Sequence, residues 1–184
     1  MDVLKIEFGG SGMTKNCYDW IEANIKHGSK IVEFGAGKVS TKVLSEKWNL
    51  FSIEQDKKYV GTYEKAKYIY APIVNGWYDP EKVFSENFPK DIDLLIIDGP
   101  LGGDRSSIIK HFHKMNIKDA VVIVDDIYRP ENKLICDHLE SLGKKIVHAG
   151  EDEGTANVVA VLTTDRSSAL RIHLVKRMQF AVLA

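Results

Sequence analysis

Two runs of four consecutive apolar residues, 94–97 (LLII) and 121–124 (VVIV), constrain the fold of this chain most strongly. A strand that faces water on one side alternates apolar and polar side chains, whereas a strand without alternation is buried on both faces. Fully buried strands are typical of the centre of a parallel sheet covered by helices on both sides. The two runs therefore predict an α/β fold.

Apolar strand-like segments and amphipathic segments alternate along most of the chain. We expect strands at 30–34, 50–53, 68–73, 93–97 and 120–124, and helices at 15–27, 41–48, 57–66, 80–87, 106–115 and 130–142. Repeated strand–helix units predict parallel strands with helices on both faces. Two further strands, 145–148 and 157–163, have only a polar loop between them, so they predict an antiparallel hairpin that closes the sheet.

Length and composition favour one globular domain. The 184 residues are 44% hydrophobic, enough for a sizeable core. We divide them into a lead-in and helix (1–29), a core (30–163) and a tail (164–184). The net charge of -1 gives no basic footprint, so we expect no nucleic-acid partner. Isolated Cys17 and Cys136, with neither a signal peptide nor a transmembrane segment evident, predict a cytoplasmic protein.

The segment K-I-V-E-F-G-A-G-K-V-S-T, residues 30–41, carries the clearest binding pattern. Glycine lacks the Cβ that would keep a ligand away from a turned backbone, and the helix that follows points free N–H groups at the loop. A dinucleotide-binding loop requires G-x-G-x-x-G, but Ser40 stands at the third glycine. The acid-x-Gly-x-Gly pattern resembles motif I of the class I S-adenosylmethionine-dependent methyltransferases. This resemblance implies that Glu33, Gly35 and Gly37 hold the methionine end of that cofactor.

The order of elements resembles the same family over residues 30–163. Five β-α units closed by a hairpin match its Rossmann-like fold, with a mostly parallel seven-stranded sheet and helices on both faces. A nucleotide-binding Rossmann domain would more often finish with a sixth parallel strand.

Further candidate cofactor residues follow the second and third strands. Glu54 ends the second strand, where adenosine-binding folds accept hydrogen bonds from ribose hydroxyls, and it resembles the motif II acid. In the family, residues after the third strand flank the adenine, which implies this role for Asn75, Gly76, Trp77 and Tyr78. An aromatic ring can stack on a base. The alternative is that Trp77 and Tyr78 pack beneath a helix.

Three aspartates follow the fourth and fifth strands. Ligands bind at the carboxyl ends of such strands, and Asp98 resembles the motif IV acid beside the transferred methyl group. Adjacent Asp125 and Asp126 repel each other unless a cation or hydrogen bonds compensate. We therefore take Asp98, Asp125 and Asp126 as candidate catalytic residues and candidate Mg²⁺ ligands. The arrangement resembles catechol-type O-methyltransferases, although their fifth strand commonly ends in Asp-Asn. The strings D-G-P and D-D-x-x-R-P resemble more closely a group of small bacterial methyltransferases, and that resemblance does not imply a metal.

Without a metal, Asp98 or Asp125 would act as the general base on a hydroxyl acceptor. Arg129 would then keep one aspartate ionised, and Arg105 would clamp an anionic group of the acceptor. His148 is a further candidate base. These alternatives remain open at the level of sequence.

The expected activity is S-adenosylmethionine-dependent transfer of a methyl group to an oxygen of a small molecule or glycan. The alternatives are a Rossmann-type NAD-dependent oxidoreductase and a catalytically inactive, cofactor-binding partner subunit. In the tail, Leu170, Leu174, Met178 and Ala181 recur at helical spacing, which is compatible with packing on the domain, with a homodimer or with a helix on a membrane surface, while a disordered tail is the alternative.

Overall fold

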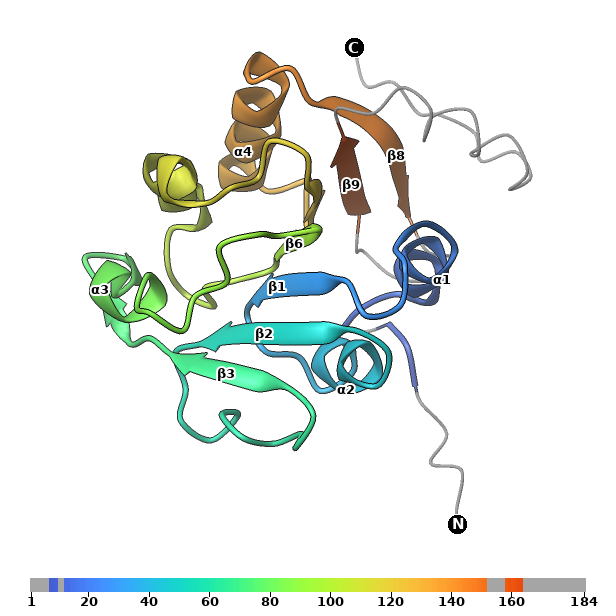
Figure 1. The fold of residues 1–184 in the computed structure, drawn as a ribbon. Helices are drawn as coiled ribbons and strands as arrows, with labels where there is room; N and C mark the ends of the chain where they lie inside the picture. Colours follow the sequence, from blue (N-terminus) through green and yellow to red (C-terminus); the bar gives the residue numbers. More distant parts are fainter. Residues whose placement is uncertain (1–6, 10–11, 152–157, 164–184) are drawn as a thin grey trace.

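A seven-stranded sheet is the centre of the structure, which is a computed structural model describing residues 7–9, 12–151 and 158–163. Its strands are β1 (Lys30–Phe34), β2 (Asn49–Glu54), β3 (Lys67–Tyr70), β6 (Leu94–Ile97), β7 (Val121–Val124), β8 (Lys145–Glu151) and β9 (Val158–Thr163). Their order in the sheet is β3-β2-β1-β6-β7-β9-β8 (Figure 1).

Strand directions confirm the predicted topology. β1 pairs in parallel with β2 and β6, and β3 and β7 extend the parallel part outward. β9 is antiparallel to both β7 and β8, so six strands point one way and β9 points the other. The two fully apolar runs are β6 and β7, and every residue of β6 is buried. The closing hairpin is present as expected, although its connection (152–157) lies outside the described residues.

Helices cover both faces of the sheet, as predicted (Figure 1). They are α1 (Lys15–Asn24), α2 (Ser40–Ser45), α3 (Pro80–Val83), α4 (Pro130–Ser141) and a 3-10 helix, η1 (Arg105–Lys114). α1 and α2 pack on one face, against side chains such as Ile31 and Ile96. α3, η1 and α4 pack on the other, against side chains such as Val32 and Leu95. The alternation of neighbouring strand residues between the two cores follows from the pleat of the sheet.

The helix predicted at 57–66 is wrong. The segment is a series of turns, in which Tyr59 N–H donates to the Asp56 carbonyl and Ala66 N–H to the Tyr63 carbonyl. Gly61 lies in its middle with φ +79°, a conformation that cannot continue a right-handed helix. The helical spacing of side chains at 57–66 therefore does not produce a helix, because Gly61 interrupts it.

The third strand is shorter than expected because a small hairpin follows it. β4 (Ile73–Val74) and β5 (Trp77–Tyr78) pair antiparallel across Asn75 and Gly76. Both turn residues have positive φ, 52° and 84°, as in the two-residue turns that favour Asn-Gly. The Asn-Gly pair between short apolar runs is a sequence signal for this hairpin that our prediction missed.

The N-terminal helix begins as expected, since the Thr14 side chain accepts a hydrogen bond from Cys17 N–H. The predicted helical tail at 164–184 lies outside the described residues. Within the part of the chain that the structure describes, no helix combines the length and apolar character needed to cross a membrane.

Candidate functional site

The candidate site lies where the direction of sheet building reverses. β1 is flanked by β2 on one side and by β6 on the other, and the loops after β1 and β6 leave the same edge of the sheet. Ligands of open α/β sheets bind at such a switch point. At this point Gly35 has φ +97°, and a Cβ on it would lie 3.2 Å from the backbone of Asp98 and Gly99. Glycine is therefore required for the two loops to pass each other.

A recess that is open to solvent lies beside this crossing. It is lined by residues from the start of α1 and the ends of β1, β6 and β7: Met13, Thr14, Cys17, Glu33, Ser40, Ile96, Asp98, Ile123 and Asp125. Three of these residues are carboxylic acids, and none is a lysine, arginine or histidine. Carboxylates stabilise nearby cations, so the three acids favour a ligand with a cationic group.

The loop after β1 contains Gly35 and Gly37 and is called the glycine loop below. Glu33 is buried at its base, with 1% of its surface exposed. One carboxylate oxygen, Oε2, accepts hydrogen bonds from Thr41 Oγ1 at 2.7 Å and Ser52 Oγ at 2.9 Å. Thr41 Oγ1 in turn accepts from Gly37 N–H at 2.9 Å. Burial raises the pKa of Glu33 to about 7, although its hydroxyl partners oppose this effect. Glu33 thus borders the recess and also fixes the loop.

Glu54 ties the loop after β2 to the glycine loop. Its Oε2 accepts from Ala36 N–H at 2.9 Å, and its Oε1 accepts from the N–H groups of Gln55 and Asp56, both at 2.7 Å. The structure therefore places Glu54 next to the glycine loop, at the end of the strand where a ribose would be expected. Its contact with ribose stays a prediction.

The expectation that Trp77 flanks an adenine does not fit the structure. Trp77 is 3% exposed, stacks on His111 at 4.4 Å between ring centroids, and packs with Phe34 in the core. The packing alternative therefore holds for Trp77. Asn75 and Gly76 are exposed in the hairpin turn, where the Gly76 carbonyl accepts from Asp104 N–H at 2.7 Å. That they contact a base stays a prediction.

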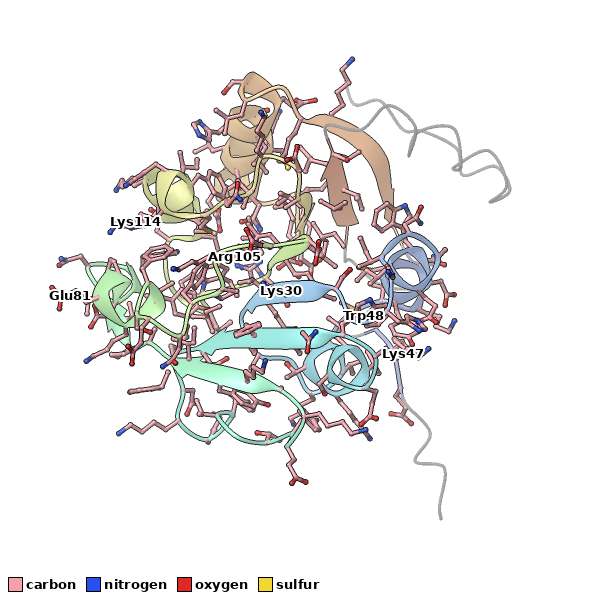
Figure 2. The ribbon with its side chains drawn as sticks, in the orientation of Figure 1. Lys30, Lys47, Trp48, Glu81, Arg105 and Lys114 are labelled. Atoms are coloured by element: carbon pink, nitrogen blue, oxygen red, sulfur yellow. The ribbon has the colours of Figure 1, made fainter. Side chains whose placement is uncertain are left out.

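Arg105 is buried between the carboxylates that follow β6 and β7. Its Nη2 lies 3.1 Å from Asp98 Oδ1, and its Nη1 lies 3.3 Å from Asp126 Oδ2. Only 4% of its side chain is exposed, and Figure 2 shows it inside the fold, whereas the labelled Glu81 and Lys114 lie at the periphery. This corrects the expectation that Arg105 clamps an acceptor at a loop tip. Arg129 contributes a second cation, 2.9 Å from Asp126 Oδ2.

The donor set does not fit the Mg²⁺ site suggested by Asp98, Asp125 and Asp126. The guanidinium of Arg105 occupies the space between Asp98 and Asp126, and it supplies the positive charge that an ion would bring. Asp126 is not among the residues that line the recess, and its catalytic role stays a prediction. Among residues 7–9, 12–151 and 158–163, no group of three His, Cys, Asp or Glu side chains is arranged to hold a metal ion.

Asp125 reaches the recess and, like Glu33, has no salt bridge among the described residues. Its Oδ1 accepts from Asp126 N–H at 2.8 Å. Burial raises the pKa of Asp125 to about 6. Burial, and then the neighbouring Asp125, raise the pKa of Asp98, while Arg105 opposes the rise. The side chain of His148, the other candidate base, lies outside the described part of the structure.

Sequence reasoning missed the groups that hold these acids in place. Thr41 and Ser52 bind Glu33, and fully buried Asn132 donates from Nδ2 to the carbonyls of Asp125 (2.8 Å) and Asp126 (3.2 Å). Single hydroxyl and amide side chains at these positions have no motif of their own. Only the folded structure reveals their partners.

No protein-family model and no curated protein matches the chain. Solved structures do match it in fold. A precorrin-6y C5,15-methyltransferase from Geobacter metallireducens is 15% identical with a TM-score of 0.58, covering 89% of this chain and 95% of that one. A TehB-like S-adenosylmethionine-dependent methyltransferase from Corynebacterium glutamicum is 18% identical with a TM-score of 0.53, covering 80% of this chain and 86% of that one.

A third match is fibrillarin from Aeropyrum pernix, solved with natively bound S-adenosyl-L-methionine. It is 12% identical with a TM-score of 0.55, covering 75% of this chain and 67% of that one. At these identities the similarity concerns the fold. The chain has the Rossmann-like α/β fold found in S-adenosylmethionine-dependent methyltransferases.

Proposed function

We propose that the protein is an S-adenosylmethionine-dependent methyltransferase that methylates an oxygen of a small molecule or sugar. The observation that carries this proposal is the recess at the sheet's switch point, where Glu33, Asp98 and Asp125 come together at the ends of β1, β6 and β7. A fold shared with methyltransferases supports it. No feature of the described residues specifically favours the oxidoreductase alternative.

The residues around the recess suit this cofactor. S-adenosylmethionine carries a sulfonium and an ammonium group, and carboxylates stabilise nearby cations. Glu33 and Asp98 line the recess and would face the methionine end, while Gly35 leaves room for the backbone of Asp98 and Gly99, and Gly37 leaves room for the Ser40 side chain. Glu54, at the end of the adjacent strand, would accept hydrogen bonds from the ribose.

When bound, the cofactor supplies an electrophilic methyl group on its sulfonium. We assign proton removal to Asp125, because it lines the recess and its carboxylate has no salt bridge among the described residues. The Asp125 carboxylate would take the acceptor's hydroxyl proton as the methyl group moves from the sulfonium to the acceptor oxygen, with the sulfur–methyl bond broken and S-adenosylhomocysteine left. Asp98 is held by Arg105 and is therefore assigned to binding and orientation. Because Asp125 must be ionised, methyl transfer should rise with pH through about 6.

Calorimetric titration with S-adenosylhomocysteine, with NAD as the comparison, tests the cofactor. Glu54→Gln should weaken S-adenosylhomocysteine binding about tenfold or more, since a hydrogen bond to a charged group contributes about 1.5–3 kcal/mol. Glu46→Gln is the matched control, because Glu46 is an exposed partner of Lys65 away from the recess. Binding of NAD without binding of S-adenosylhomocysteine would contradict the proposal.

Asp125→Asn tests the assignment of the base. The variant should keep its affinity for S-adenosylhomocysteine and lose about 10²–10⁴-fold in methyl transfer, the usual range for a general base. Methyl transfer would be followed with labelled S-adenosylmethionine across a panel of phenols, catechols and sugars, with EDTA and with added Mg²⁺. Cofactor binding without transfer to any acceptor would favour the inactive-subunit alternative, and a strict need for Mg²⁺ would contradict the role given to Arg105.

A further inference from the structure

The chain makes a left-handed turn at Asp126, directly after β7. Asp126 has φ 51°, and its side chain is buried. Residues other than glycine rarely adopt this conformation, although Asp tolerates it better than most, and it persists where neighbouring groups enforce it. Backbone strain of this kind occurs at functional sites. The conformation of Asp126 therefore depends on the side chains that bind it.

Four side chains hold the turn. The Asp126 carboxylate lies 3.3 Å from Nη1 of Arg105 and 2.9 Å from Nη2 of Arg129. Asn132 Nδ2 donates to the carbonyls of Asp125 and Asp126, at 2.8 and 3.2 Å. Asp126 N–H donates to Asp125 Oδ1 at 2.8 Å. Both polar groups of the Asp126 backbone and its carboxylate are thus bound.

The turn separates two adjacent carboxylates. Asp125 lines the recess, whereas Asp126 does not and is paired with two arginines. If Asp126 left its arginines, two adjacent carboxylates would be free to approach the same recess, where like charges repel. The direction of the Asp125 side chain therefore depends on the conformation of its neighbour.

We propose that Arg105 is a positioning residue that enforces the turn at Asp126 and thereby keeps the Asp125 carboxylate aimed into the recess. Arg105 comes from η1, on the face of the sheet opposite α1, and it also binds Asp98 at 3.1 Å after β6. One planar guanidinium thus sets the ends of β6 and β7 relative to each other. A lysine supplies one compact charge and cannot bind two carboxylates with the same fixed geometry.

The inference rests on the proposed function only in naming Asp125 as the proton acceptor. The geometry can be tested in the free protein, because the Asp126 N–H bond to Asp125 Oδ1 forms only while the turn and the Asp125 side chain keep their positions. Protection of this amide against hydrogen exchange reports both.

Arg105→Lys keeps the positive charge but removes the planar guanidinium with its two NH2 groups. The variant therefore separates the positioning of the two carboxylates from compensation of their charge. We expect hydrogen exchange of the Asp126 amide, followed by NMR, to accelerate at least tenfold in Arg105→Lys, while amides in β1 and β2 keep their protection. Arg129→Lys is the matched control on the same carboxylate, and we expect a smaller effect because Arg129 is 38% exposed and is not paired with Asp98. Unchanged protection in Arg105→Lys would overturn the proposal.

A second comparison remains informative if changes at Arg105 prevent folding. Asp126→Gly and Asp126→Ala both remove the carboxylate, but only glycine adopts positive φ without penalty. With Arg105 unchanged, we expect the amide of residue 126 to exchange at least tenfold more slowly in Asp126→Gly than in Asp126→Ala. Equal exchange would show that the turn does not hold Asp125 and would overturn the proposal. Titration of the same proteins with S-adenosylhomocysteine tests the proposed function separately, because the exchange measurement requires no cofactor.

Discussion

Glu33→Gln tests whether ionisation of the buried Glu33 carboxyl, beneath the glycine loop, lowers the stability of the protein. Glu33 is 1% exposed, and burial raises its pKa from 4.5 to about 7. The folded chain therefore favours the neutral acid, whereas the unfolded chain ionises near pH 4.5. Stability linked to this group is fully present below pH 4.5 and is lost as the pH rises through about 7. At 1.36 kcal/mol per pKa unit, the whole loss is about 3 kcal/mol.

Glutamine cannot ionise, so the variant lacks this loss. Between pH 5 and pH 8, its free energy of unfolding should rise relative to that of the natural sequence by about 2–3 kcal/mol. Urea unfolding of both proteins at pH 5, 6, 7 and 8 measures this difference. Both proteins contain Asp98 and Asp125, so the contribution of these two acids to the pH dependence cancels in the difference between the two free energies of unfolding.

Glu46→Gln is the control, because Glu46 is exposed and should show a difference that changes little with pH. The absolute effect of Glu33→Gln at any one pH is less informative, since an amide does not reproduce every contact of a carboxylate. A difference between Glu33→Gln and the natural sequence that stays constant from pH 5 to pH 8 would refute the reasoning.

Three further substitutions test individual features. Gly35→Ala should destabilise by at least about 1 kcal/mol more than Gly61→Ala in urea unfolding; both glycines have positive φ, but only a Cβ at Gly35 meets backbone at 3.2 Å. Equal losses would show that the two loops can separate. Tyr78→Phe should change stability by less than about 1 kcal/mol, because the buried hydroxyl has no hydrogen-bond partner among the described residues; a thermal-unfolding loss above 2 kcal/mol would reveal a partner. Asn75→Ala should cost about 1–2 kcal/mol, since its φ is 52°, and Asn75→Gly should cost less; the reverse order would contradict the turn.

The site combines two kinds of acid that the sequence lists side by side. Asp125 and Asp126 are adjacent and chemically identical, yet one lines the recess and the other is bound by two arginines. Their environments differ because a single backbone torsion turns them apart. A sequence pattern contains no information on that torsion, so both residues looked equally suited to catalysis or metal binding.

Arg105 illustrates the same limit. The sequence predicted that its side chain clamps an anionic group of the acceptor, whereas in the structure the side chain is buried between Asp98 and Asp126, after the ends of β6 and β7. The two terminal nitrogens of its guanidinium then bind two carboxylates that follow different strands. Sequence separation hides such a contact, because Asp98 and Asp126 become neighbours only when β6 and β7 pair.

The sequence by itself determined the α/β class, the parallel centre of the sheet and the closing hairpin. Fully apolar strands and the 3.6-residue period of helices are local consequences of burial, so they can be read without a structure. It also located Glu33, Gly35, Gly37 and Asp98 at strand ends, because the chain order of strands and loops fixes where such residues emerge. These positions follow from residues close together in the chain.

Tertiary structure decided which of these residues are free to act. It buried Trp77 in the core, engaged Asp126 with Arg105 and Arg129, and left Asp125 at the recess. Hydrogen bonds and ion pairs between distant segments depend on angles and distances set by the packing of the whole sheet. That is the physical reason why the sequence could nominate the acids of this site but could not assign their roles.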